Sequence, residues 1–124
     1  MSESIVIVED ESQIRTLLKR VLSKEGFSVI EAEDGTRALP RIRKLRGRVA
    51  AVLTDIDMGR MNGIELAESL MAEFPAVPIV FISALPVPPA ELERVVPGSA
   101  FVHKPFESGD VIKIVREVIS KKGR

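Results

Sequence analysis

The chain contains no cysteine, no tryptophan and no tyrosine among its 124 residues. Without cysteine it can form neither disulfides nor thiolate metal sites. Without the two larger aromatic residues, stacking on nucleic-acid bases is disfavoured, although five phenylalanines are present. Long hydrophobic runs are also missing: the N-terminal apolar run extends only from Ile5 to Val8 and ends in acids, which fits neither a signal peptide nor a membrane span. We therefore expect no membrane contact and a cytoplasmic location.

The chain also lacks an excess of either charge, because 18 lysines and arginines balance 18 acids. A net charge of zero argues against electrostatic wrapping of nucleic acid, so we expect no nucleic-acid partner for this chain alone. A hydrophobic fraction of 45% and a charged fraction of 29% are ordinary for a globular protein. The length predicts one domain over residues 1–124, with no interdomain linker and no output domain in this chain.

Short β-branched runs alternate with longer segments of helical periodicity. We predict strands at Ser4–Val8, Phe27–Ala32, Val49–Thr54, Val77–Ile82 and Ala100–Val102. We predict helices at Glu11–Glu25, Gly35–Arg46, from Gly63 to just before Pro75, Ala90–Val96 and Ser108–Lys121. Such alternation predicts βαβ units, a parallel sheet and an α/β three-layer sandwich. Right-handed crossovers leave few topologies, of which we favour the flavodoxin-like strand order 2-1-3-4-5.

Proline affects two of the predicted helices. Pro40 lies within the second helix, where it removes a backbone donor and crowds the preceding turn, so we expect a kink or a late start. The run Leu85-Pro86-Val87-Pro88-Pro89 is incompatible with an ordinary helix. We therefore expect the fourth helix to be short or displaced, and a regular helix beginning by Val87 would contradict this.

Polar side chains follow four of the five predicted strands. They are Glu9 and Asp10 after the first, Asp55 after the third, Ser83 after the fourth and Lys104 after the fifth. The carboxyl ends of parallel strands meet at one edge of the sheet, where ligands bind. In the order 2-1-3-4-5 these four strands are neighbours, so their polar residues converge. Three acids, a hydroxyl and a lysine together indicate a site for a divalent metal and a phosphoryl group.

Six short segments, in this order and at these spacings, form a recognisable pattern. They are Val6–Glu11, Glu33–Gly35, Leu53–Met58, Met61–Gly63, Ile82–Ala84 and Lys104–Phe106. The pattern resembles the response-regulator receiver domain, the phosphoacceptor module of two-component signalling, over essentially the whole chain. Any one segment alone would be a weak signal, whereas the set is specific.

The resemblance implies a role for each acid of the predicted site. Asp55 would be the phosphorylated aspartate, and Glu9 and Asp10 would form the acidic metal-binding pair. Asp57 would complete the metal site through its backbone carbonyl. The implied cofactor is Mg²⁺ or Mn²⁺, and Lys104 would be the active-site lysine that stabilises a phosphoryl oxygen.

The resemblance also implies a switch. Ser83 would supply a hydroxyl to the phosphoryl group, Phe101 stands at the aromatic switch position, and the Lys104–Pro105 peptide bond would be cis. The phosphoryl donor would be a histidine kinase or phosphotransfer protein. A downstream protein partner would bind the face made by the fourth helix, fifth strand and fifth helix, and a homodimer is compatible with this arrangement. The protein would be a signalling phosphoacceptor, not an enzyme, and would catalyse only its own phosphorylation and dephosphorylation.

Two features depart from the receiver pattern. Gly59 replaces the proline usually found four residues after the phosphoacceptor, so we expect a looser loop there. The proline-rich segment after Ser83 replaces the usual start of the fourth helix. This second departure bears on the partner surface more than on the chemistry.

Other functions remain compatible with parts of the pattern. A pseudo-receiver would bind partners without regard to phosphate. Asp55-Ile56-Asp57 after an apolar strand is also similar to the nucleophile motif of haloacid-dehalogenase-type phosphohydrolases. That motif normally lies on the first strand, and this chain has no room for a substrate cap. His103, the only histidine, is interpreted as an ordinary strand-end residue and not as a phosphodonor.

Overall fold

The computed structural model describes residues 3–58, 60–86 and 89–122. These residues form five strands: β1 (Ser4–Val8), β2 (Ser28–Ala32), β3 (Ala51–Asp55), β4 (Ile79–Ser83) and β5 (Ala100–His103). They also form five helices: α1 (Ser12–Lys24), α2 (Gly35–Lys44), α3 (Gly63–Glu73), α4 (Ala90–Val95) and α5 (Ser108–Lys122). The strands pair in parallel in the order β2-β1-β3-β4-β5. The predicted fold class and strand order are therefore confirmed.

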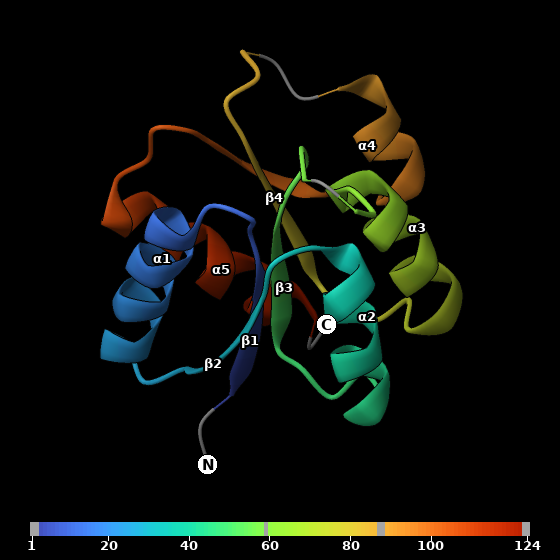
Figure 1. The fold of residues 1–124 in the computed structure, drawn as a ribbon, viewed down its shortest axis with the longest axis horizontal. Coiled ribbons are helices and arrows are strands. Elements are labelled where there is room, and N and C mark those ends of the chain that lie inside the picture. Colours follow the sequence, from blue (N-terminus) through green and yellow to red (C-terminus); the bar gives the residue numbers. More distant parts are fainter. Residues whose placement is uncertain (1–2, 59, 87–88, 123–124) are drawn as a thin grey trace.

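Helices cover both faces of the sheet (Figure 1), with α1 and α5 on one side and α2, α3 and α4 on the other. Strand β1 shows why both faces are apolar. Ile5 and Ile7 pack with the α1 and α5 side, whereas Val6 and Val8 pack with the α2 to α4 side. Side chains alternate along a strand, so a continuous apolar run serves both cores. The sheet is thus buried on both faces, and its strand ends are left to carry polar groups.

Strands β3 and β4 end one residue later than the sequence predicted. Asp55 is therefore the last residue of β3 and Ser83 the last residue of β4, and both are buried. They lie in neighbouring strands, because Asp55 pairs with Ile82, the residue before Ser83. The apolar strand holds each polar side chain in place at the edge of the sheet.

Pro40 does not delay the start of α2. The helix begins at Gly35, because the Asp34 side chain accepts a hydrogen bond from the Arg37 N–H and caps the first turn. Pro40 lies within the helix on its exposed side, and Thr36, whose carbonyl loses its intrahelical donor, is also exposed. Water can therefore satisfy that carbonyl. The expected late start was wrong, and the expected kink stays a prediction.

Helix α4 is short, as predicted. It has six residues and begins at Ala90, with Pro89 in an extended conformation at its N-cap. A regular helix beginning by Val87 would have contradicted this prediction. Val87 and Pro88 themselves lie outside the described residues. Within the described part of the chain, no helix combines the length and the apolar character that a membrane crossing requires.

Candidate functional site

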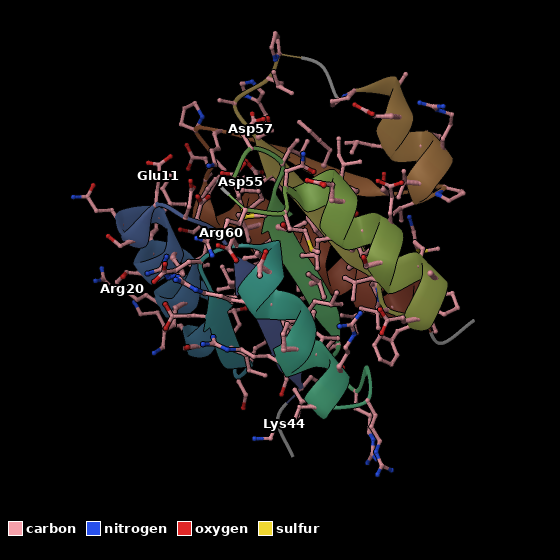
Figure 2. The ribbon with its side chains drawn as sticks, turned by 45° about the vertical axis from the view of Figure 1, so that its right-hand side comes forward. Glu11, Arg20, Lys44, Asp55, Asp57 and Arg60 are labelled. Carbon is pink, nitrogen blue, oxygen red and sulfur yellow. The ribbon has the colours of Figure 1, made fainter. Side chains whose placement is uncertain are left out.

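Three acids gather at the carboxyl edge of the sheet. Glu9, Asp10 and Asp55 each offer a carboxylate oxygen, and these oxygens all lie within 4.8 Å of one another. Glu9 and Asp55 are 1% and 6% exposed, whereas Asp10 is exposed to solvent. Figure 2 shows Asp55 at this edge, next to the loop that carries Asp57. Carboxylate oxygens are what a hard divalent cation prefers, so the donor set fits Mg²⁺ or Mn²⁺.

Lys104 joins two of these acids. Its Nζ donates to Glu9 Oε1 at 2.8 Å and to Asp55 Oδ2 at 2.9 Å. Burial by itself would lower the pKa of Lys104, but the hydrogen bonds to Glu9 and Asp55 more than offset it, and the pKa is raised. Lys104 is therefore a fixed positive charge at neutral pH, placed where negative charge would collect.

Glu9 is the most buried acid of the site. The pKa of its carboxyl is raised from 4.5 to about 7, mainly by burial and to a smaller extent by the nearby Asp55 carboxylate. Hydrogen bonds from Lys104 and from the Glu11 N–H oppose this rise in pKa, because they favour the carboxylate. Glu9 thus changes its charge near neutral pH, while its partner Lys104 stays charged.

The backbone around Asp55 is closely fixed. Its Oδ1 accepts a hydrogen bond from the Asp57 N–H at 3.2 Å, and its carbonyl accepts one from Thr54 Oγ1 at 3.0 Å. Gly63, the first residue of α3, passes so close that a Cβ built there would lie 2.2 Å from the Asp55 carbonyl oxygen. The loop after β3 can therefore return over the site only because residue 63 has no side chain.

The other predicted site residues lie outside this group of three acids. Ser83 is 1% exposed, and its Oγ accepts a hydrogen bond from the Leu85 N–H at 3.0 Å. The Ser83 carbonyl accepts one from the Lys104 N–H, which ties β4 to the residue that follows β5. The Asp57 side chain is exposed and is not part of the three-acid group. The Lys104–Pro105 peptide bond is cis.

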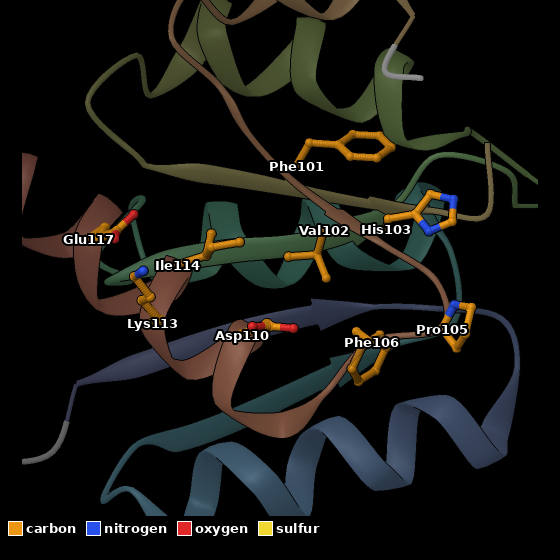
Figure 3. Close-up of a pocket in the computed structure, with 9 residues that line it drawn as sticks. All are labelled: Phe101, Val102, His103, Pro105, Phe106, Asp110, Lys113, Ile114 and Glu117. Carbon is orange, nitrogen blue, oxygen red and sulfur yellow. The ribbon is translucent and has the colours of Figure 1, made fainter. Parts of the chain in front are cut away.

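Phe101 lies on β5 and is only partly buried, against the core on the α2 to α4 side. It also lines a cavity of about 410 Å³ along β5 and α5, together with His103 and Phe106 (Figure 3). His103 is exposed there, one residue before Lys104. Phe101 is therefore separate from the acidic cluster but belongs to the strand that leads into it.

Three further residues shape the site, and no role was predicted for them from the sequence: Arg15, Thr54 and Gly63. Arg15 Nη1 donates to the backbone carbonyl of Glu9 at 2.7 Å. Its position one helical turn after Glu11 was the available signal, since a side chain there can reach back over the loop. The contacts of Thr54 and Gly63 depend on loop geometry, which the sequence does not display.

A doubly wound parallel sheet that carries acids, a serine and a lysine at the carboxyl ends of its strands has a polar site where proteins of this α/β class bind their ligands. The chain matches the response regulator receiver domain over residues 5–116. It therefore belongs to the receiver-domain family of two-component signalling.

Individual relatives agree with this assignment. The chemotaxis protein CheY of Thermotoga maritima is 30% identical over 120 residues, which cover 95% of this chain and 98% of that protein. The transcriptional regulatory protein SrrA of Staphylococcus aureus is 31% identical over 98% of this chain, but the match covers only 49% of SrrA. The sensor kinase CckA of Brucella abortus is 32% identical, over 13% of its length. The chain thus corresponds to a whole protein in one relative and to a part in others.

Solved structures show the same fold. CheY4 of Vibrio cholerae superposes with a TM-score of 0.85 at 23% identity, covering 95% of this chain and 99% of that one. NtrX of Brucella abortus, solved with ATP, gives a TM-score of 0.87 at 27% identity, covering 99% of this chain and 28% of that one.

Proposed function

We propose that the chain is a phosphoacceptor that receives a phosphoryl group on Asp55 from a histidine kinase or phosphotransfer protein. The observation that carries this proposal is the position of Lys104 Nζ, 2.9 Å from Asp55 Oδ2 and 2.8 Å from Glu9 Oε1. In this arrangement the buried Asp55 carboxylate lies beside a fixed cation, Lys104, which can compensate the negative charge that a phosphoryl group brings to the site. Phosphoryl transfer asks a protein mainly for such positioning and electrostatic stabilisation.

In the proposed reaction a carboxylate oxygen of Asp55 forms the new P–O bond. The P–N bond to the donor imidazole breaks as it forms, and the released imidazole takes up a proton from solvent. The Asp57 N–H holds Asp55 Oδ1, so the carboxylate keeps one orientation during the attack. Lys104 can move from Asp55 Oδ2 to a phosphoryl oxygen entering beside it, and Ser83 can donate to another.

Glu9, Asp10 and Asp55 are the side chains that would hold Mg²⁺ or Mn²⁺, with the Asp57 carbonyl as a further ligand. When bound, the cation supplies charge neutralisation between the nucleophile and the phosphoryl group. The acids themselves repel one another, and Lys104 compensates only part of that repulsion. The chain therefore favours a cation at this position on electrostatic grounds.

The signal would pass through Ser83 and Phe101. Phosphorylation would draw the Ser83 hydroxyl away from the Leu85 N–H and let Phe101 turn inward from the cavity it lines. A downstream protein partner, or a second copy of the chain, would then read the face made by α4, β5 and α5. A ligand shifts such an equilibrium only through contacts that differ between the states, and Ser83 provides one. Residues 1–124 would act as one receiver domain in the cytoplasm.

The test is intact-mass spectrometry after incubation with Mg²⁺ and a small acyl-phosphate donor. We expect a Mg²⁺-dependent gain of one phosphoryl group in the wild type and in Asp110→Asn, an exposed control on α5, but not in Asp55→Asn. Continuous turnover of an external phosphate ester would instead identify a phosphohydrolase. Absence of phosphorylation both by the small donor and by a phosphorylated histidine-kinase domain would leave a pseudo-receiver.

A further inference from the structure

The two acids that follow β1 differ in how they are held. Glu9 is buried and hydrogen-bonded through its side chain to Lys104 and to the Glu11 N–H. Asp10 is exposed, and in the described part of the chain its carboxylate has no hydrogen-bond or ion-pair partner. The direction of the Asp10 side chain therefore depends on its backbone, and above all on the peptide unit that joins it to Glu9.

The backbone of Glu9 is held on both sides of its Cα: in the preceding peptide unit through the Glu9 N–H, and in the unit shared with Asp10 through the Glu9 carbonyl. The Glu9 N–H donates to the Ala32 carbonyl at 3.0 Å, which continues the β1–β2 ladder one step beyond the strand. The Glu9 carbonyl accepts Nη1 of Arg15 at 2.7 Å. Both backbone groups of Glu9 are thus fixed, and the carbonyl is fixed by a charged donor, which makes a stronger hydrogen bond than a neutral one.

Arg15 is itself anchored by a second contact. Its Nε lies 3.5 Å from Glu31 Oε1, and Glu31 is the penultimate residue of β2. The Arg15 side chain is 17% exposed, so its orientation is largely determined by these partners. A guanidinium can reach the Glu9 carbonyl with one nitrogen and Glu31 with another, whereas the single ammonium of lysine cannot span both in the same way.

We propose that Arg15 is a positioning residue for the metal site: by binding the Glu9 carbonyl while anchored on Glu31, it sets the orientation of Asp10. This inference rests on the proposed function, in which Glu9 and Asp10 hold a divalent cation. Arg15 contacts the backbone between the two acids and does not bind their carboxylates. It therefore orders ligands without being a ligand.

Because Arg15 is positively charged, the proposal can be tested by whether divalent-cation affinity rises or falls when Arg15 is replaced. A cation close to a metal site repels the metal, so simple electrostatics predicts that removing Arg15 strengthens divalent-cation binding. Positioning predicts the reverse, because residues that orient metal ligands typically contribute ten- to a hundredfold to affinity. The direction of the change therefore separates the two effects.

The experiment measures Mn²⁺ binding from the EPR signal of the free ion. We expect about tenfold weaker binding in Arg15→Ala and Arg15→Lys, and a smaller loss in Glu31→Gln. Arg20→Ala removes an exposed cation from the same helix and is the matched control, for which we expect no weakening. Unchanged or tighter Mn²⁺ binding in both Arg15 variants would overturn the proposal. If the wild type itself fails to bind Mn²⁺, the proposed function fails instead.

A metal-free measurement completes the test. The carbonyl ¹³C resonance of Glu9 reports the hydrogen bond from Arg15, so it should shift upfield in Arg15→Ala and not in Arg20→Ala. If this resonance does not move in Arg15→Ala, the hydrogen bond is absent in solution and the proposal is wrong. Urea unfolding of each variant identifies any that is not folded, and Arg15→Lys keeps the test open if Arg15→Ala is not.

Discussion

Replacing Glu9 by glutamine should change how stability depends on pH. The pKa of Glu9 is raised from 4.5 to about 7 in the folded protein, mainly by burial. Between these two pH values the folded protein binds more protons than the unfolded chain, so this group makes stability fall as pH rises through the window. Below the window the effect is fully favourable, and above about pH 7 the loss is complete.

The size of the effect follows from the shift in pKa. Each unit is worth about 1.4 kcal/mol, so a rise from 4.5 to about 7 corresponds to about 3 kcal/mol across the whole window. Glu9→Gln removes this dependence, because an amide does not titrate. Relative to wild type, the variant should gain about 2 kcal/mol of stability between about pH 5 and pH 8.

The assay is urea unfolding followed by circular dichroism, with EDTA present so that no metal contributes. The hydrogen bond from the Glu11 N–H to Glu9 Oε2 must be remade in the variant, which adds a constant cost that does not vary with pH. Only the change with pH is therefore diagnostic. Glu68→Gln, at an exposed position on α3, controls for the loss of one carboxylate. A stability difference between wild type and Glu9→Gln that stays flat from pH 5 to pH 8 would refute the reasoning.

Two further predictions concern the loop after β3. Asn62→Ala should destabilise the protein by about 1 kcal/mol, because Asn62 accepts hydrogen bonds from the Ile64 and Glu65 N–H groups in a capping box; urea unfolding measures it, and no loss would show that the cap is replaceable by water. Gly63→Ala should cost about 3 kcal/mol or more and weaken Mn²⁺ binding, since its Cβ would lie 2.2 Å from the Asp55 carbonyl oxygen. Wild-type stability and Mn²⁺ affinity in Gly63→Ala would contradict the close approach.

The sheet order was predictable because each strand is an apolar run that alternates with a helical segment. The convergence of Asp55, Ser83 and Lys104 then followed from the geometry of parallel strands, in which all carboxyl ends lie at one edge. What could not be predicted depends on side-chain direction. Lys104 reaches both Glu9 and Asp55 because its side chain extends from the residue after β5, past β4, to the acids at the ends of β1 and β3. The role of Arg15 could not be predicted, because Arg15 donates to a backbone carbonyl and the sequence does not show which carbonyl a side chain reaches.

The predictions based on proline were correct for the short helix α4 and wrong for a late start of α2, and the difference has a physical cause. Pro86, Pro88 and Pro89 disfavour helix in the segment before α4, and α4 begins at Ala90. Pro40 affects a single hydrogen bond on an exposed side of α2, where water can replace the missing donor. The capping of α2 by Asp34 determines its start regardless of that loss. A proline inside a pattern therefore has to be weighed against the cap that precedes it.

The contact between Lys104 and Glu9 joins residues 95 positions apart in the chain. Contacts of such high sequence separation form late in folding, because a long stretch of chain must first be ordered. A chain emerging from the ribosome carries Glu9, Asp10 and Asp55 well before Lys104 has been synthesised. The acids then lack their compensating cation. If Asp55 is the phosphoacceptor, as proposed, competence to receive a phosphoryl group arrives only after β5 and Lys104 have been made, so a chain that ends before them would not take phosphate from its donor.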